Sequence, residues 1–192
     1  LAAIPRGDWI DPVKAIGRPD APITIVMFAD FWCPACRAAS ATLLAYQAQH
    51  PRAVRVVYRH LPLWEIPGHE TSKAAAALSE MAGEQGKFWE FAHALHGAPR
   101  QLSRADYLTL MVQLGFEPEA VEARLSSPQD PALLRVTREI AFAEQVGVTA
   151  TPTFILLVEA HAPVAVSQAA LPRWLNSPTI TAILAREQQP GP

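Results

Sequence analysis

The chain has 192 residues, half of them hydrophobic and 18% charged, which is enough apolar material for a folded core. Its formal net charge is −2, so charge suggests neither nucleic acid nor an anionic membrane surface as a partner. No apolar run approaches the roughly 18 residues of a membrane-spanning helix. The sequence starts at Leu1 without Met, from which we expect a processed or truncated N-terminus whose signal peptide or anchor has been removed.

The first half of the chain predicts a strand, a turn and a helix after an ordered lead-in. Residues 1–22 show little periodicity and are expected to pack on the domain through anchors such as Trp9. The apolar, β-branched run Ile23–Phe28 predicts a buried strand. The Ala- and Leu-rich segment Arg37–Gln49 has no Gly or Pro and predicts a helix.

The chain's two cysteines lie between that strand and that helix, in the sequence Cys33-Pro34-Ala35-Cys36. Cys33 falls at the predicted helix N-terminus, where unpaired N–H groups and the helix dipole favour a thiolate. We therefore predict a depressed pKa for Cys33. Cys36, one turn further on, is expected to be more buried and to resolve a mixed disulfide. Pro34 suits a helix start, because its missing N–H costs nothing there.

A zinc site is the alternative interpretation of a CxxC motif. Such a site usually needs four ligands, and the sequence has no second CxxC and no HxxxH nearby. The motif therefore favours redox chemistry, and we predict no metal site. His93 and His96 are three residues apart on a predicted helix, but no third ligand lies at a readable spacing.

The second strand and a long helical stretch follow. Val54–His60 alternates around β-branched residues and predicts a strand, which completes a βαβ unit. Residues 67–145 then predict helices, with a capping box at Ser103–Asp106 and an N-cap at Asp130. The helical segments expected there are Thr71–Gly83, Lys87–His96, Tyr107–Leu114, Glu117–Leu125 and one from Pro131 to the stop at Gly147.

An α/β pattern resumes near Val148. Thr151-Pro152 stands immediately before the apolar strand Thr153–Val158, where a proline is out of place unless it has a special role. Pro163–Val166 is expected to return beside that strand as a hairpin. Two short helical segments, Pro172–Leu175 and Pro178–Arg186, end the fold, and a frayed tail is expected from Gln188.

These features together resemble one known family. CPAC after an apolar strand, a helical insertion, and then VTATPTF before another strand are similar to the DsbA-like thiol–disulfide oxidoreductases of the thioredoxin superfamily. The segments DAPITIVMFADFWCPAC, VRVVYRHLPL and QGKFWEFAHALHG support the likeness, which covers roughly residues 11–184. The resemblance implies an α/β, thioredoxin-like fold with a helical insertion. The expected division is a lead-in over 1–22, a thioredoxin-like domain over 23–66 and 147–188, an insertion over 67–146 and a tail over 189–192.

The same resemblance implies roles for individual residues. It predicts a cis peptide bond at Pro152, packed beside Cys33, with the backbone of Thr151 binding an extended substrate peptide by strand addition. Pro34, Ala35 and Thr151 occupy the positions that tune redox poise in this superfamily. Pro34 resembles the oxidising members, whereas Thr151 does not decide the direction.

Several neighbours of the motif have two interpretations each. Many relatives carry a buried acid six residues before the first cysteine, where this chain has Met27. Asp30, expected nearer the solvent end of the strand, either substitutes in part for that acid or is a turn residue. Trp32 and Trp64 are candidates for an apolar groove that receives unfolded substrates, and Trp64 is equally a candidate for the core. Arg37 either adds positive potential near the thiolate or faces water. His60 is expected to be structural.

We therefore predict a thiol–disulfide oxidoreductase that introduces disulfides into extracytoplasmic proteins through Cys33 and Cys36. The absence of other cysteines suits an oxidising compartment. Expected partners are reduced or unfolded proteins and a quinone-linked membrane oxidase for recycling; no cofactor beyond the disulfide, no nucleic acid and a monomeric state are expected. Two alternatives stay open: a periplasmic reductase or isomerase, and a dithiol protein that binds Cu(I).

Overall fold

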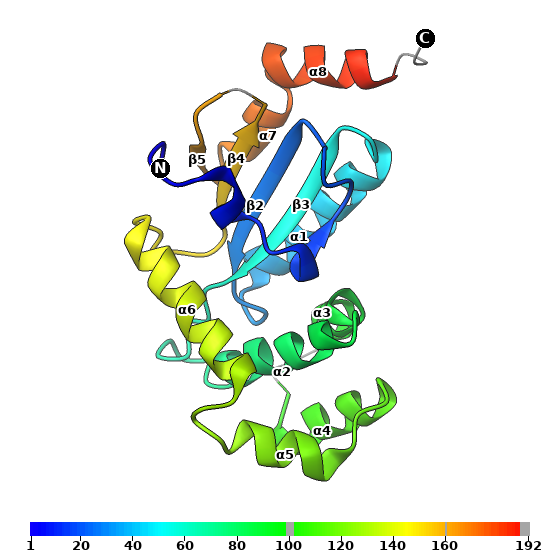
Figure 1. Cartoon of the computed structure of the whole chain (residues 1–192), viewed down its shortest axis with the longest axis vertical. Helices are drawn as coiled ribbons and strands as arrows, with labels where there is room; N and C mark the ends of the chain where they lie inside the picture. The colour runs from blue at the N-terminus through cyan, green and yellow to red at the C-terminus, as the bar shows by residue number, and fades with distance from the viewer. Residues whose placement is uncertain (99–101, 160, 189–192) are drawn as a thin grey trace. The chain divides into compact units, whose positions relative to one another are not determined.

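A computed structural model describes residues 1–98, 102–159 and 161–188 (Figure 1). The chain forms two compact units, each built from separate stretches of sequence. The first, here called the sheet unit, comprises Leu1–Phe28, Ala38–Arg59 and Pro152–Pro192. The second, the helical unit, comprises Ala29–Arg37 and His60–Thr151. The predicted domain bounds stay a prediction, and the predicted tail over 189–192 lies outside the described residues.

The sheet unit is organised around a mixed sheet of five strands in the order β1-β3-β2-β4-β5. The strands are β1 (Ala15–Ile16), β2 (Ile23–Ala29), β3 (Val54–His60), β4 (Thr153–Val158) and β5 (Val164–Ser167). The pairs β1–β3, β2–β4 and β4–β5 are antiparallel. β2 and β3 are neighbours in the sheet and are joined in sequence by α1 (Pro34–Gln49), as the predicted βαβ unit requires.

β2 lies at the centre of this sheet, and all seven of its residues are buried. A strand covered on both faces needs a continuous apolar run rather than an alternating one, which explains the sequence ITIVMFA. Its pairing with β4 places Met27 opposite Phe154. Met27 is 1% exposed, so an apolar side chain fills the position where many relatives were expected to carry an acid.

The lead-in contains structure that the sequence did not predict. Two short 3-10 helices, Arg6–Trp9 and Pro12–Lys14, precede β1, a strand of only two residues. Gly17 follows β1 with a φ of +107°, and a Cβ there would lie 2.5 Å from the carbonyl oxygen of Val54. The chain therefore passes so close to β3 that only glycine fits. A two-residue strand is too short to give the periodicity on which the prediction depended.

The helical unit contains five helices among its described residues, labelled α2–α6 in Figure 1. α2 packs against both α3 and α6, and α4 packs against α5. The predicted capping box of Ser103 and Asp106 and the predicted N-cap at Asp130 are both present. The bounds are α2 (Ser72–Glu84), α3 (Phe88–Gly97), α4 (Arg104–Gln113), α5 (Pro118–Leu125) and α6 (Pro131–Gln145).

The remaining elements follow the prediction closely. The hairpin expected after β4 is confirmed, because β5 pairs with it. α7 (Leu171–Leu175) and α8 (Pro178–Gln188) close the sheet unit. None of the helices in the part of the chain that is described is long and apolar enough to cross a membrane.

Candidate active site

The two cysteines lie where the sequence predicted, at the start of α1. Pro34 is the first residue of the helix, and the N–H of Arg37 donates to the carbonyl oxygen of Cys33 (3.1 Å). Before the helix, the N–H of Cys33 donates to the carbonyl oxygen of Asp30 (3.2 Å). Both cysteines are free thiols. Cys33 is 8% exposed and Cys36 only 1%, so the prediction that Cys36 is the more buried is confirmed.

The pKa values of the two thiols are shifted in opposite directions. The pKa of Cys33 is lowered to about 5, chiefly by a hydrogen bond from the Cys36 thiol and against the effect of burial, with further donation from backbone N–H groups and Thr151. The pKa of Cys36 is raised, first because its proton is held by Cys33 and then because the thiol is buried. The predicted depressed pKa is therefore present, but its largest cause is the second cysteine rather than the helix N-terminus.

Thr151 is the second component of the site. The Sγ atom of Cys33 lies 3.7 Å from the carbonyl oxygen of Thr151. The Thr151 hydroxyl is buried, and its donation to the Cys33 thiolate lowers the pKa of Cys33. Pro152 is buried, and the cis geometry expected for its peptide bond stays a prediction.

The side chain of Asp30, which was expected nearer the solvent end of the strand, is buried at 1% exposure. Oδ1 accepts hydrogen bonds from the N–H of Trp32 (2.6 Å) and the hydroxyl of Ser72 (2.8 Å). Oδ2 accepts from the N–H of Leu63 (2.7 Å) and lies 3.0 Å from Nδ1 of His69. The turn between β2 and α1, residues 30–33, is here called the redox turn. The Asp30 carboxylate thus joins the redox turn to the loop after β3 and to the beginning of α2.

Trp32 is also fixed within the helical unit. Its side-chain Nε1–H donates to the hydroxyl of Tyr107 on α4 (2.9 Å), and that hydroxyl lies 3.1 Å from Oγ1 of Thr71. Burial raises the pKa of Tyr107 to about 12, so its hydroxyl stays protonated. At 6% exposure Trp32 offers little surface, and its predicted role in binding substrates stays a prediction.

Arg37 neither points into water nor stands alone near the thiolate. Its guanidinium donates to the carbonyl oxygens of Phe31 (3.3 Å) and Ala98 (2.7 Å). The same group lies 5.0 Å from the centre of the Trp32 ring, a cation–π distance. Arg37 therefore ties the first turn of α1 to the end of α3.

The network around the motif could not be found from the sequence. Leu63, His69 and Ser72 lie 33 to 42 residues after Asp30, and Tyr107 lies 75 residues after Trp32. No motif spacing links such positions. The contact pattern of the chain explains the result, because residues Ala29–Arg37 belong to the helical unit and not to the strands that precede them.

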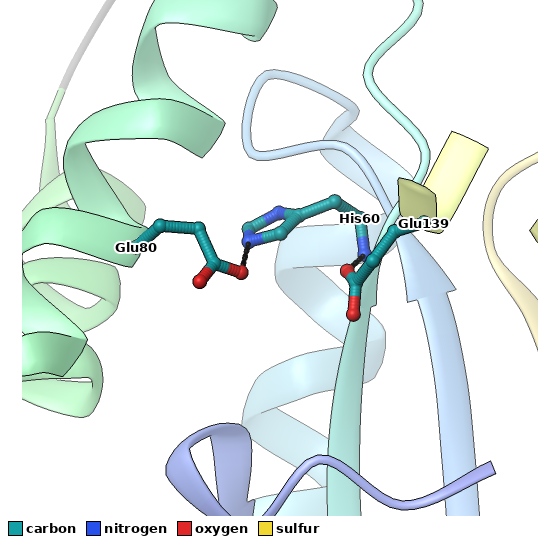
Figure 2. A group of neighbouring side chains, drawn as sticks. All are labelled: His60, Glu80 and Glu139. Carbon is teal, nitrogen blue, oxygen red and sulfur yellow. Dashed lines mark hydrogen bonds and ion pairs between the residues drawn. The ribbon is translucent and has the colours of Figure 1, made fainter. Parts of the chain in front are cut away.

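One buried cluster has the residue types of a metal site, namely His60, Glu80 and Glu139 (Figure 2). Their side chains already bind protein donors. Nε2 of His60 lies 3.3 Å from Glu80, and the backbone N–H of His60 donates to Glu139 (2.6 Å). The second oxygen of Glu80 pairs with Arg135 (2.7 Å). A cation would have to displace these contacts, so we interpret the cluster as an ion-pair network that holds the end of β3.

The histidine pair on α3 is not part of that cluster. Burial, then Arg37 and His93, lower the pKa of His96 to about 4, so its ring is neutral at pH 7. That ring lies 5.7 Å from the ring of Phe31, between centroids, as a packing contact. His93 is exposed.

Comparison with known proteins assigns the family. A family profile described as Thioredoxin matches residues 11–175, which is most of the chain. The chain belongs to the thioredoxin family. The DsbA-like, thioredoxin-like α/β fold predicted from the sequence is thereby confirmed.

Solved structures agree with this assignment. A thioredoxin-like oxidoreductase from Silicibacter pomeroyi DSS-3 is 28% identical, has a TM-score of 0.69, and the match covers 97% of this chain and 100% of that one. DsbA2 of Pseudomonas aeruginosa is 24% identical with a TM-score of 0.63, and the match covers 84% of this chain and 93% of that one. At that lower identity DsbA2 supports the fold alone.

The curated relatives are much longer proteins. One named Na(+)/H(+) antiporter NhaA 1, from Mycolicibacterium vanbaalenii, is 31% identical over 165 residues, covering 78% of this chain and 26% of that protein. Another, NhaA of Herminiimonas arsenicoxydans, is 34% identical over 147 residues, covering 77% of this chain and 22% of that one. The chain therefore spans about a quarter of the length of the curated relatives that it matches.

Proposed function

We propose that this protein donates disulfide bonds to reduced proteins outside the cytoplasm. The observation that supports this best is the acidity difference between Cys33, with a pKa of about 5, and Cys36, whose pKa is raised. A stabilised Cys33 thiolate favours the reduced protein over its disulfide, and a protein that is more stable when reduced is a stronger oxidant. This asymmetry supports the oxidising direction in the proposal.

The proposed reaction has two exchange steps. A substrate thiolate attacks Sγ of Cys33 in the oxidised protein; the Cys33–Cys36 bond breaks, and Cys36 leaves with the electron pair and takes a proton. A second substrate thiolate then attacks the substrate sulfur of the mixed disulfide and expels Cys33 as a thiolate. Two electrons pass to the protein, which ends with Cys33 ionised and Cys36 protonated, and one proton goes to solvent.

The surrounding residues have supporting roles in this proposal. The Thr151 hydroxyl donates to the Cys33 thiolate, and the backbone of Thr151 receives the substrate peptide. Pro34 and Ala35 set the turn between the two sulfurs. Asp30 and Trp32 hold the turn in place, and Pro152, in the cis form, immediately precedes β4.

Regeneration of the disulfide requires an electron acceptor, for which we propose a quinone-linked membrane oxidase. The curated relatives are named as Na(+)/H(+) antiporters, which are membrane proteins, and this chain matches a segment of them. A thiol–disulfide exchange protein that acts close to a membrane fits both observations. We expect the protein to act as a monomer.

The test is the equilibrium of the Cys33–Cys36 pair with glutathione, followed by the fluorescence of the adjacent Trp32. A potential above about −180 mV would support a disulfide donor, because the cytosolic glutathione poise lies near −220 mV or below. A potential near that of thioredoxin, about −270 mV, would contradict the proposal and indicate a reductase. Stoichiometric Cu(I) bound tightly to the reduced protein, without exchange activity, would indicate a metal-binding dithiol protein instead.

A further inference from the structure

The Cys36 thiol holds a proton that must leave whenever the reduced pair becomes a disulfide. This thiol is 1% exposed, and its hydrogen bond to Cys33 together with burial raises its pKa. The groups that act on it most strongly are Cys33, the backbone of Asp30 and Thr151, and none of these is a carboxylate or an imidazole. An oxidant that brought its own base to this position would remove the difficulty.

The lowered pKa of Cys33 does not by itself make its sulfur react faster with an oxidant. A change from 9.0 to about 5 raises the thiolate fraction at pH 7 from about 1% to about 99%, a gain of about 100-fold. The same change makes each thiolate about 40- to 100-fold less nucleophilic, for a Brønsted coefficient of about 0.4–0.5. The two effects nearly cancel, so a faster reaction has to come from the groups placed around the sulfur.

Hydrogen-bond donors and an acceptor surround the Sγ atom of Cys33. The donors to the thiolate are the Cys36 thiol, Thr151 and the backbone N–H groups of Ala35 and Cys36. The acceptor is the carbonyl oxygen of Thr151, which lies 3.7 Å from the sulfur. An ionised Cys33 no longer donates to this oxygen, so the oxygen can accept an O–H group from a ligand. A molecule with an O–H group next to an oxygen that leaves as a base would use both.

Hydroperoxides have this arrangement of atoms. We propose that hydrogen peroxide and small alkyl hydroperoxides oxidise the reduced protein directly, with Cys33 as the nucleophile and the Cys36 thiol as the proton donor to the leaving oxygen. At 8% exposure the Cys33 sulfur is accessible to a small oxidant. The inference deepens the proposed function and rests on it, because it names a class of oxidant that restores the disulfide which the protein then donates.

The reaction has two steps. The Cys33 thiolate attacks the terminal oxygen of the hydroperoxide, the O–O bond breaks, and the leaving alkoxide or hydroxide takes the proton of Cys36. Cys33 is then a sulfenic acid and Cys36 a thiolate. This thiolate attacks the Cys33 sulfur, the S–O bond breaks, and the hydroxide that leaves takes a proton from solvent. Two electrons pass from the sulfurs to the peroxide, which becomes an alcohol (or water) and water.

The first test is the rate of oxidation of the reduced protein by hydrogen peroxide and by tert-butyl hydroperoxide, followed by tryptophan fluorescence in a stopped-flow instrument. General-acid catalysis contributes about 10²–10⁴-fold, which outweighs the loss of nucleophilicity. We therefore expect each Cys33 thiolate to react about tenfold faster than a glutathione thiolate, and one equivalent of peroxide to consume both thiols. A rate per thiolate at or below that of glutathione would overturn the proposal.

Two variants at one position separate proton donation from the thiolate itself. Cys36→Ser and Cys36→Ala both lack the resolving thiol, so each should stop at a sulfenic acid that dimedone traps. Only the serine keeps a donor for the leaving oxygen. Once the rates are corrected for the thiolate fraction at each pH, we expect Cys36→Ala to be about tenfold or more slower than wild type and Cys36→Ser to lie between them. Equal corrected rates in all three proteins would refute a role for the Cys36 proton.

A third variant and the reaction product test the assignment of the nucleophile. Cys33→Ser keeps Cys36 as the only thiol, and we expect it to react far more slowly than wild type. A wild-type rate in Cys33→Ser would show that Cys33 is not the nucleophile. In the wild-type protein the product should be the Cys33–Cys36 disulfide. A sulfinic acid at Cys33 in its place would contradict the second step, because Cys36 would then not have attacked in time.

The equilibrium with glutathione separates this inference from the proposed function. If the potential is that of a disulfide donor but the peroxides react no faster per thiolate than with glutathione, the inference is wrong and the proposed function stands. If the peroxides react as expected but the potential is near that of thioredoxin, the proposed function fails and the peroxide reaction stands.

Discussion

The acidity of Cys33 predicts that the reduced protein is stabilised by rising pH. Its pKa of about 5 in the folded protein lies below the ordinary value of 9.0. The stabilisation is therefore complete above the pKa of Cys33 in the unfolded chain, 9.0, and is lost as the pH falls through its pKa in the folded protein, about 5. At pH 7, two units above the folded pKa, the lowered pKa adds about 2.7 kcal/mol to the free energy of unfolding of the reduced protein. Allowing for solvent screening at a thiol that is still partly accessible, we expect about 2 kcal/mol, or about 40 mV in potential.

The potential itself should report the same pKa. Between pH 5 and 9 the reduced pair binds one proton, at Cys36, so the potential should fall by about 30 mV per pH unit. Below pH 5 Cys33 is protonated as well, and the slope should double. The assay is the potential against glutathione across this range, together with the ultraviolet absorbance of the thiolate in the reduced protein. A thiolate that appears only above pH 7, or a potential with one slope throughout, would refute the reasoning.

Two variants test the cause of the shift. The hydrogen bond from Cys36 is the largest contribution to the lowered pKa of Cys33, and donation from Thr151 is a smaller one. Cys36→Ala should therefore raise the pKa of Cys33 more than Thr151→Val does. An effect of Thr151→Val equal to that of Cys36→Ala would contradict this order, and unchanged far-ultraviolet circular dichroism would show that both variants are folded.

Three further substitutions test the contacts that hold the redox turn. Asp30→Asn should destabilise the reduced protein by about 2–3 kcal/mol in urea unfolding, because its NH₂ group cannot accept the hydrogen bonds of the carboxylate; wild-type stability would contradict this. Tyr107→Phe should cost about 1 kcal/mol and change the fluorescence of Trp32, which loses its acceptor. Arg37→Met should lower the free energy of unfolding by about 1–2 kcal/mol, because the hydrogen bonds to carbonyl oxygens are lost. This loss should not depend on salt. Wild-type stability of the variant would contradict the prediction.

The elements that were predicted correctly are those with strong local signals. The run of apolar residues in β2 marked a strand buried on both faces, and the capping box of Ser103 and Asp106 marked the start of α4. The spacing of Cys33 and Cys36 correctly placed both cysteines at the start of α1, and their redox chemistry stays a prediction. In each case a few adjacent residues determine the local structure, so a short stretch of sequence is enough to predict it.

The features that were missed depend on residues far apart in the chain. The sequence left two roles open for Asp30, because its hydrogen-bond partners come from the loop after β3 and from α2, far along the chain. β1 was missed because two residues have no period, and its existence depends on a glycine that lets it approach β3. The main cause of the Cys33 acidity was misassigned because a helix start is visible in sequence, whereas the orientation of the Cys36 thiol is not.

The surroundings of Asp30 also decide between the two roles that the sequence left open for it. A carboxylate has about four lone-pair sites, and Asp30 has four partners: Trp32, Ser72, Leu63 and His69. Accepting a proton from Cys36 would require one of these contacts to break in a buried site, which carries the cost of an unsatisfied donor. Asp30 is therefore better suited to anchor the turn than to act as a base. Because Met27 stands where the resemblance implies an acid, the proton of Cys36 must leave by another route when the Cys33–Cys36 disulfide is formed again, and we expect this re-oxidation step to be slow.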